Sequence, residues 1–171
     1  MPIPEGYTPV SDKTIFVIGP EASGSRLIAR HVAHAHGIHG WGGHAWACGP
    51  FACILHCSLP YTKHRHWLDV ETCRQRYPNR RWILCTRDAT CSASSSIQSK
   101  WTPQERAENR NMASIMMNSL LLSDERTYVW SYETFMLLGK PYFMDLCKFL
   151  DIETHGIFTL TDGNKKYMKG Q

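Results

Sequence analysis

The chain has 171 residues, of which 20% are charged and 11% aromatic, and this composition indicates a globular protein rather than a disordered one. Its net charge of +4 fits an anionic ligand but is too small to indicate a nucleic-acid-binding groove. The sequence has no apolar run of about 18 residues, which a membrane span needs, and no signal-peptide core. We therefore expect a single cytoplasmic domain over residues 1–171.

The first predicted strand is followed by a loop of small residues and then a helix. Residues 15–18 are apolar (Ile-Phe-Val-Ile), and after Gly24 apolar residues recur at helical spacing until Gly37 ends the helix. Such a loop directs backbone N–H groups and a helix N-terminus at one point, which suits a phosphate or sulfate. The residues ahead of this strand, 1–13, are predicted to be an extended lead-in.

The loop nearly matches the nucleotide-binding pattern G-x-x-x-x-G-K-[ST], with Gly19 and Gly24 in place. Ser25 stands where the pattern has lysine, and Arg26 stands where it has the hydroxyl that binds magnesium. An ATP or GTP hydrolase needs both of those groups. The loop therefore fits an anion but not a magnesium–nucleotide complex.

The rest of the chain alternates strands and helices, which predicts an α/β fold with a parallel sheet. In such sheets, ligands bind at the carboxyl ends of the strands. A capping box at Thr102 opens the longest helix. Strands are expected at 51–57, 81–87 and 127–131; helices are expected at 67–76, 88–99, 103–122, 132–138 and 141–150; and residues 37–50 are expected to form a loop. The longest helix is expected to bury Ile115, Met116, Leu120 and Leu121.

A second anion-binding motif follows the strand at 81–87. Arg87 ends that strand, where an NTPase usually has an acidic residue that holds magnesium. An arginine binds an anion directly, and a serine in the helix that follows can reach the same anion. The available serines are 92, 94, 95 and 96. Two anion sites without a magnesium carboxylate indicate a nucleotide with phosphate groups at two positions.

Together these motifs resemble sulfotransferases that use 3′-phosphoadenosine 5′-phosphosulfate (PAPS). In that family the first loop holds the 5′-phosphosulfate, and an arginine with a serine eight residues later holds the 3′-phosphate; Arg87 and Ser95 have that spacing. The resemblance extends over roughly Thr14 to Tyr167. It implies a three-layer, P-loop NTPase-like parallel sheet flanked by helices. It also implies PAPS as co-substrate, 3′,5′-bisphosphoadenosine as product, and no required metal.

The resemblance also implies the remaining cofactor contacts. The pair Tyr132-Glu133 matches a Tyr-Glu pair that lies beside the adenine, and a basic C-terminal segment (151–171) with Lys165 and Lys166 would close over the cofactor. Many family members have Lys or Arg at the position of Ala22, whereas Arg26 resembles an arrangement in which a basic residue follows the loop. The loop residues expected to hold the phosphosulfate are Glu21, Ala22, Ser23, Gly24, Ser25 and Arg26.

The implied reaction transfers a sulfuryl group directly to a hydroxyl or amine of a small-molecule or glycan acceptor, with no nucleic-acid or membrane partner. A base removes the acceptor proton while cations hold the departing phosphate oxygen. Arg26 and the loop amides are the candidates on the leaving side. His56, near the end of the second predicted strand, is the preferred base. His64 and His66 are rivals, and Glu21 is a further choice.

Three alternatives stay open. A nucleotide or small-molecule kinase with a degenerate loop would need the lysine that Ser25 replaces, and a non-catalytic nucleotide-binding module is compatible with Ala22. The third is a His/Cys metal protein, because His44, Cys48, Cys53, His56 and Cys57 can be drawn as a zinc site. Their spacings match no zinc pattern, so we expect no metal. The seven cysteines are odd in number and include no Cys-x-x-Cys, which argues against a disulfide framework, and Cys85 is expected to be a buried thiol.

Overall fold

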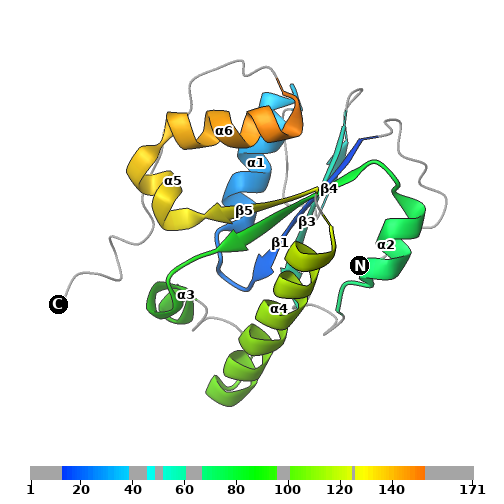
Figure 1. Ribbon diagram of the computed structural model, residues 1–171. Helices are drawn as coiled ribbons and strands as arrows, with labels where there is room; N and C mark the ends of the chain where they lie inside the picture. Colours follow the sequence, from blue (N-terminus) through cyan, green and yellow to red (C-terminus); the bar gives the residue numbers. More distant parts are fainter. Residues whose placement is uncertain are drawn as a thin grey trace.

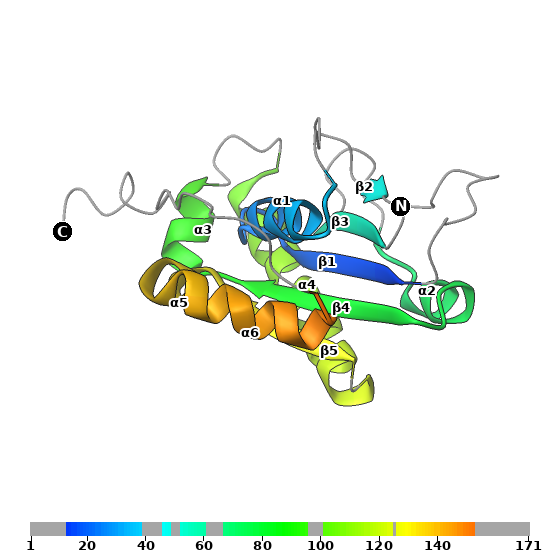
Figure 2. The same cartoon turned by 90° about the horizontal axis from the view of Figure 1, so that it is seen from above.

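A computed structural model of the protein describes residues 13–38, 46–48, 52–60, 67–95, 101–124 and 126–152. It shows a five-stranded sheet with helices on both faces (Figures 1 and 2). The strands are β1 (Thr14–Pro20), β2 (Trp46–Cys48), β3 (Cys53–Leu59), β4 (Arg80–Thr86) and β5 (Thr127–Ser131), in the spatial order β2-β3-β1-β4-β5. The four strands β3, β1, β4 and β5 are parallel, and β2 pairs antiparallel with β3. The predicted three-layer α/β fold is confirmed.

The helices divide between the two faces of the sheet (Figure 2). Their bounds are α1 (Ser25–Ala35), α2 (Val70–Arg76), α3 (Ala89–Ser95), α4 (Pro103–Ser123), α5 (Tyr132–Leu138) and α6 (Lys140–Leu150). Side chains alternate along β1, so that Ile15 and Val17 pack into the core formed with α1, α5 and α6. Phe16 and Ile18 point to the other face and pack with residues of α4.

The expected elements differ from the structure mainly at their ends. The strand predicted at 51–57 is β3, at Cys53–Leu59, and the helix predicted from residue 67 begins at Val70. Part of the segment predicted to be a loop forms β2. A short strand of this kind covers the edge of β3, which would otherwise expose unpaired backbone groups. The lead-in 1–12 and the tail 153–171 lie outside the described residues.

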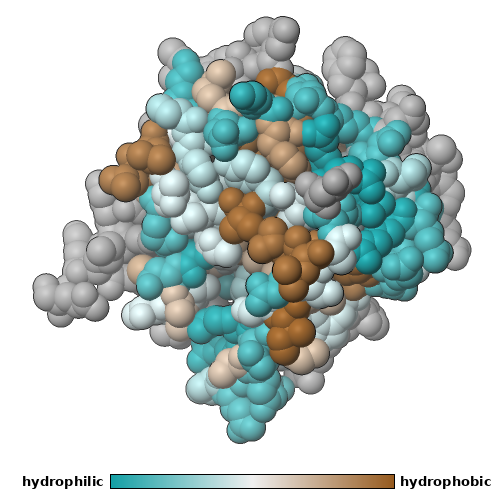
Figure 3. All heavy atoms as spheres, in the orientation of Figure 1, coloured by the Kyte–Doolittle hydropathy of each residue, from teal (hydrophilic) through white to brown (hydrophobic). Residues whose placement is uncertain are grey.

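The burial predicted for α4 is wrong at two positions. Ile115 is 56% exposed and Leu121 is 47% exposed. The buried stripe is narrower than expected because the buried residues of α4 are Ala113, Met117 and Leu120, which are three to four residues apart on one side of the helix, and Met116 packs beside them only partly buried. The apolar residues left outside the stripe form part of the hydrophobic surface along α4 in Figure 3.

Among the described cysteines, Cys53 is disulfide-bonded, although the sequence argued against a disulfide framework. Cys57, Cys73, Cys85, Cys91 and Cys147 are free. The prediction of a buried thiol at Cys85 is confirmed, and burial raises the pKa of this thiol well above its ordinary value. In the described part of the chain, none of the helices has the length and apolar character needed to cross a membrane.

A buried carboxylate ties the end of α4 to the start of β4. Asp124 is 6% exposed and accepts hydrogen bonds from the Arg80 guanidinium at 2.6 Å and from Trp82 Nε1 at 3.1 Å. Burial opposes ionisation of this carboxyl group, but the hydrogen bonds from the Arg126 backbone, Trp82 and Arg80 lower its pKa overall. Asp124 therefore stays ionised opposite Arg80, which is itself buried.

We expect Asp124→Asn to destabilise the fold by about 3–5 kcal/mol, because it leaves the Arg80 charge buried without a counter-ion. Urea unfolding measures this loss. Asp145→Asn on the exposed face of α6 is the control and changes little, because an amide oxygen can still accept the hydrogen bond that the Tyr128 hydroxyl donates there. Since the folded-state pKa of Asp124 is lowered, its stabilisation is present above the ordinary value of 3.8 and is lost as the pH falls through the lowered value. Equal unfolding midpoints for the two variants would contradict a structural role for this ion pair.

Candidate functional site

The loop between β1 and α1 turns sharply at the carboxyl edge of the sheet. Ala22 and Gly24 have left-handed backbones with φ of 63° and 85°, and the Ser23 N–H donates to the Pro20 carbonyl at 3.1 Å. Gly24 is the N-cap of α1, and no side chain caps this helix end. The first N–H groups of α1 and the positive end of the helix dipole therefore remain suited to an anion.

Both glycines of the loop pattern are required by packing. A Cβ atom on Gly19 would lie 2.5 Å from Ser23 Oγ and 2.7 Å from the Cys85 carbonyl oxygen. On Gly24 it would lie 2.7 Å from a ring carbon of Tyr132. The end of β1 and the loop after it consequently lie directly against β4 and α5. This close packing brings the loop next to residues at the ends of the neighbouring strands.

We expect Gly19→Ala to destabilise the protein by about 2 kcal/mol or more, because two close contacts, one of them to backbone, have to move. Gly37→Ala is the matched control: its φ is 71°, but no atom lies within 4 Å of the added Cβ. Backbone strain alone costs this control about 1 kcal/mol. Equal free energies of unfolding for the two variants, measured in urea, would show that the loop is not held as tightly as described.

Arg87 joins the end of β4 to this loop. Its guanidinium donates to the Ala22 carbonyl at 2.9 Å, and its Cζ lies 4.5 Å from the centroid of the Tyr132 ring. Ser92, on α3, donates to the Glu21 carbonyl at 3.1 Å. The predicted loop and the predicted second anion-binding motif are therefore in direct contact.

Tyr132 and Glu133, expected beside an adenine, contact the loop, Arg87 and the start of α3. Tyr132 is 4% exposed and lies between the Arg87 guanidinium and Gly24. Glu133 accepts the Asp88 backbone N–H at 3.0 Å, and the Asp88 carboxylate in turn accepts the Cys91 N–H at 2.8 Å, as an N-cap side chain does at the start of a helix. This pair fixes the position of Arg87 and the start of α3.

His56 contacts the loop rather than open solvent. Its Nε2 and the Ser25 hydroxyl form a 2.9 Å hydrogen bond, and Ser25 is only 4% exposed. Burial and then the positive charge of Arg26 lower the pKa of the imidazole to about 4, so His56 is neutral at pH 7. A neutral imidazole with so low a pKa is a weak proton acceptor, and its evident role here is to orient Ser25.

The low pKa of His56 predicts a pH-dependent stability. Because the folded-state pKa of about 4 is below the ordinary histidine value of 6.5, the unfolded chain binds the proton more tightly and stability declines as the pH falls from 6.5 to 4. We expect His56→Gln to make this decline shallower, with the remaining slope set by groups such as His36, whose pKa is also lowered to about 4. NMR titration of the His56 ring tests the cause directly, and a value near 6.5 would contradict the described burial.

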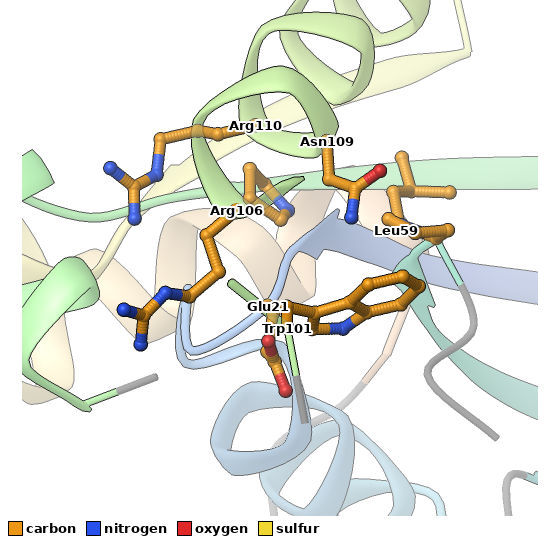
Figure 4. Close-up of a pocket in the computed structure, with 8 residues that line it drawn as sticks. Glu21, Leu59, Trp101, Arg106, Asn109 and Arg110 are labelled. Atoms are coloured by element: carbon orange, nitrogen blue, oxygen red, sulfur yellow. The ribbon is translucent and has the colours of Figure 1, made fainter. Parts of the chain in front are cut away.

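A small cavity of about 20 Å³ lies beside the loop (Figure 4). It is on the face of the sheet that α4 covers, opposite the face of the His56–Ser25 pair. Its lining includes Glu21, Leu59, Trp101, Arg106, Asn109 and Arg110. Sequence reasoning missed the three α4 residues, although two arginines four residues apart at the start of a helix mark one basic face.

Some of the predicted site residues fall outside the described structure. These are His64, His66, Lys165 and Lys166, together with the side chain of Ser95, whose backbone ends α3. Arg26 is exposed in the first turn of α1, next to the loop. Over the described residues, no three His, Cys, Asp or Glu side chains are grouped as a metal site would require.

Comparison with protein-family models finds none that matches this chain, and comparison with curated proteins finds no match either.

Proposed function

We propose that the protein is a PAPS-dependent sulfotransferase that acts on a hydroxyl or amine of a small-molecule or glycan acceptor. The observation that carries this proposal is the direct contact between Arg87 and the loop that leads into the uncapped N-terminus of α1. The two predicted anion-binding elements, this loop and Arg87, thus lie next to each other at one edge of the sheet. The loop has Ser25 in place of the lysine, and β4 is followed by Arg87 in place of a carboxylate, so a magnesium–triphosphate is a poorer fit than a nucleotide with separate 5′ and 3′ phosphates.

The 5′-phosphosulfate would bind to the N–H groups of residues 24–26 at the start of α1, because the Ser23 N–H already donates to the Pro20 carbonyl. These groups and the Arg26 side chain stabilise the charge that develops on the bridging oxygen. The acceptor oxygen attacks sulfur, and the bond between sulfur and that bridging oxygen breaks. 3′,5′-Bisphosphoadenosine leaves with the bonding electrons, and the acceptor proton passes to a base.

The 3′-phosphate would bind Arg87. The guanidinium of Arg87 is held in place by the Tyr132 ring beneath it and by the Ala22 carbonyl at its edge. Because this side chain is already ordered, it loses little conformational entropy when the phosphate binds. Tyr132 then acts as a support for Arg87 rather than as an exposed stacking surface, because it is 4% exposed.

Two described residues compete for the role of base. The Nε2 atom of His56 is engaged with Ser25 and has a low pKa. Glu21 lines the cavity beside the loop, where an acceptor can approach the bound phosphosulfate. This geometry favours Glu21 as the base and assigns His56 to positioning of the loop.

We expect Arg87→Ala to weaken the binding of 3′,5′-bisphosphoadenosine by about ten-fold or more, because a charge-assisted phosphate contact is lost. Calorimetric titration without magnesium measures this change. Arg76→Ala, which removes an exposed charge from α2, is the control and should change the affinity by no more than about two-fold, since distant exposed charges are screened. Equal affinities of wild type and Arg87→Ala would remove the proposed 3′-phosphate site, and no binding by wild type would overturn the proposed function.

A further inference from the structure

The cavity beside the loop is bounded by elements that meet at the carboxyl edge of the sheet. Glu21 comes from the loop, Leu59 ends β3, and Arg106, Asn109 and Arg110 lie on the first turns of α4. Figure 4 shows the two arginines extending to the same side from α4, with the Asn109 amide on the side of the Trp101 ring. Ligands of open α/β sheets bind at this edge.

Two polar groups of the cavity are buried without partners. Among the described residues, neither Asn109 Nδ2 nor Arg110 Nε has a hydrogen-bond partner. Buried donors left in this state cost free energy, and a charged donor costs more than a neutral one. The cavity of about 20 Å³ has room for one group the size of a water molecule. One oxygen of an acid group fits this room, and it pairs with a guanidinium more strongly than water does.

The charge of the lining points to the same kind of group. Arg106 and Arg110 contribute two positive charges, against the single carboxylate of Glu21 among the described lining residues. Trp101 adds a flat apolar surface that can pack against a ring. The carboxylate of Glu21 disfavours an acid group on the loop side, so the acid group is directed to the arginines and the neutral hydroxyl to the loop.

We infer that this cavity receives the acid group of the acceptor, and that Arg106, Asn109 and Arg110 select ring-bearing acceptors that carry an acid group (carboxylate, sulfate or phosphate) together with the hydroxyl to be sulfated. This inference rests on the proposed function, since it is the bound PAPS that makes the neighbouring cavity part of an acceptor site. It adds a substrate class and names the residues that choose it.

The test uses the whole chain saturated with 3′,5′-bisphosphoadenosine, so that the nucleotide occupies the loop. Saturation-transfer NMR titrations compare 4-hydroxybenzoate with the neutral 4-hydroxybenzamide, and glucuronate with glucose. We expect each acid to bind about ten-fold or more tightly than its neutral counterpart. Arg110→Gln should abolish this preference and leave the affinities for the neutral probes within about two-fold, because the neutral probes do not depend on the guanidinium charge.

Two further variants keep the result interpretable. Arg106→Gln reports on the same cavity if Arg110→Gln lowers the melting temperature, and it should also reduce the preference for acids. Arg76→Gln on α2 removes the same charge at an exposed position and should leave the preference unchanged.

The possible failures are separable. If wild type binds 3′,5′-bisphosphoadenosine but binds neither acid, or binds acid and neutral probes equally, the acceptor inference is overturned and the proposed function stands. A preference for acids that survives both cavity variants overturns the inference as well. If wild type does not bind 3′,5′-bisphosphoadenosine at all, the proposed function falls, and the acceptor site falls with it.

Discussion

The loop between β1 and α1 lies so close to β4 and α5 that neither Gly19 nor Gly24 has room for a Cβ atom. This close packing is the constraint on which the carboxyl edge of the sheet depends. It places the Ala22 carbonyl within reach of Arg87 and the Glu21 carbonyl within reach of Ser92. The uncapped N-terminus of α1 and the arginine after β4 consequently form one surface, although about sixty residues separate them in the chain.

A second interaction, at the C-terminal end of α4, sets the position of this helix. The buried pair of Arg80 and Asp124 fixes the end of the helix to the start of β4. Ala113, Met117 and Leu120 then hold the middle of the helix to the sheet. Because a helix is stiff along its axis, these contacts also determine where its first turns, with Arg106 and Arg110, meet the loop. The proposed acceptor cavity thus depends on packing several turns away from it.

Much of the fold could be predicted from the sequence, because hydrophobic periodicity and helix capping are visible within short stretches of the chain. The spacing of Gly19 and Gly24 and the placement of Arg87 at a strand end also predicted the two elements that the structure brings into contact at the carboxyl edge of the sheet. The partner of His56 could not be predicted, because it depends on the register that places His56 beside Val17 of β1 and on the start of α1. The angle at which α4 crosses the sheet determines that Ile115 and Leu121 are exposed and which side of the helix faces the cavity. This angle could not be predicted, because it does not follow from a local sequence pattern.

The central claim is that the site holds two separate phosphate groups of one nucleotide without magnesium. The most direct test compares the affinities of wild type for 3′,5′-bisphosphoadenosine and 5′-AMP without magnesium, and for ATP with magnesium, by calorimetric titration. The account predicts that the bisphosphate binds about ten-fold or more tightly than 5′-AMP, because only it engages Arg87, and that magnesium gives no gain. Tighter binding of magnesium–ATP, or equal binding of 5′-AMP and the bisphosphate, would contradict it.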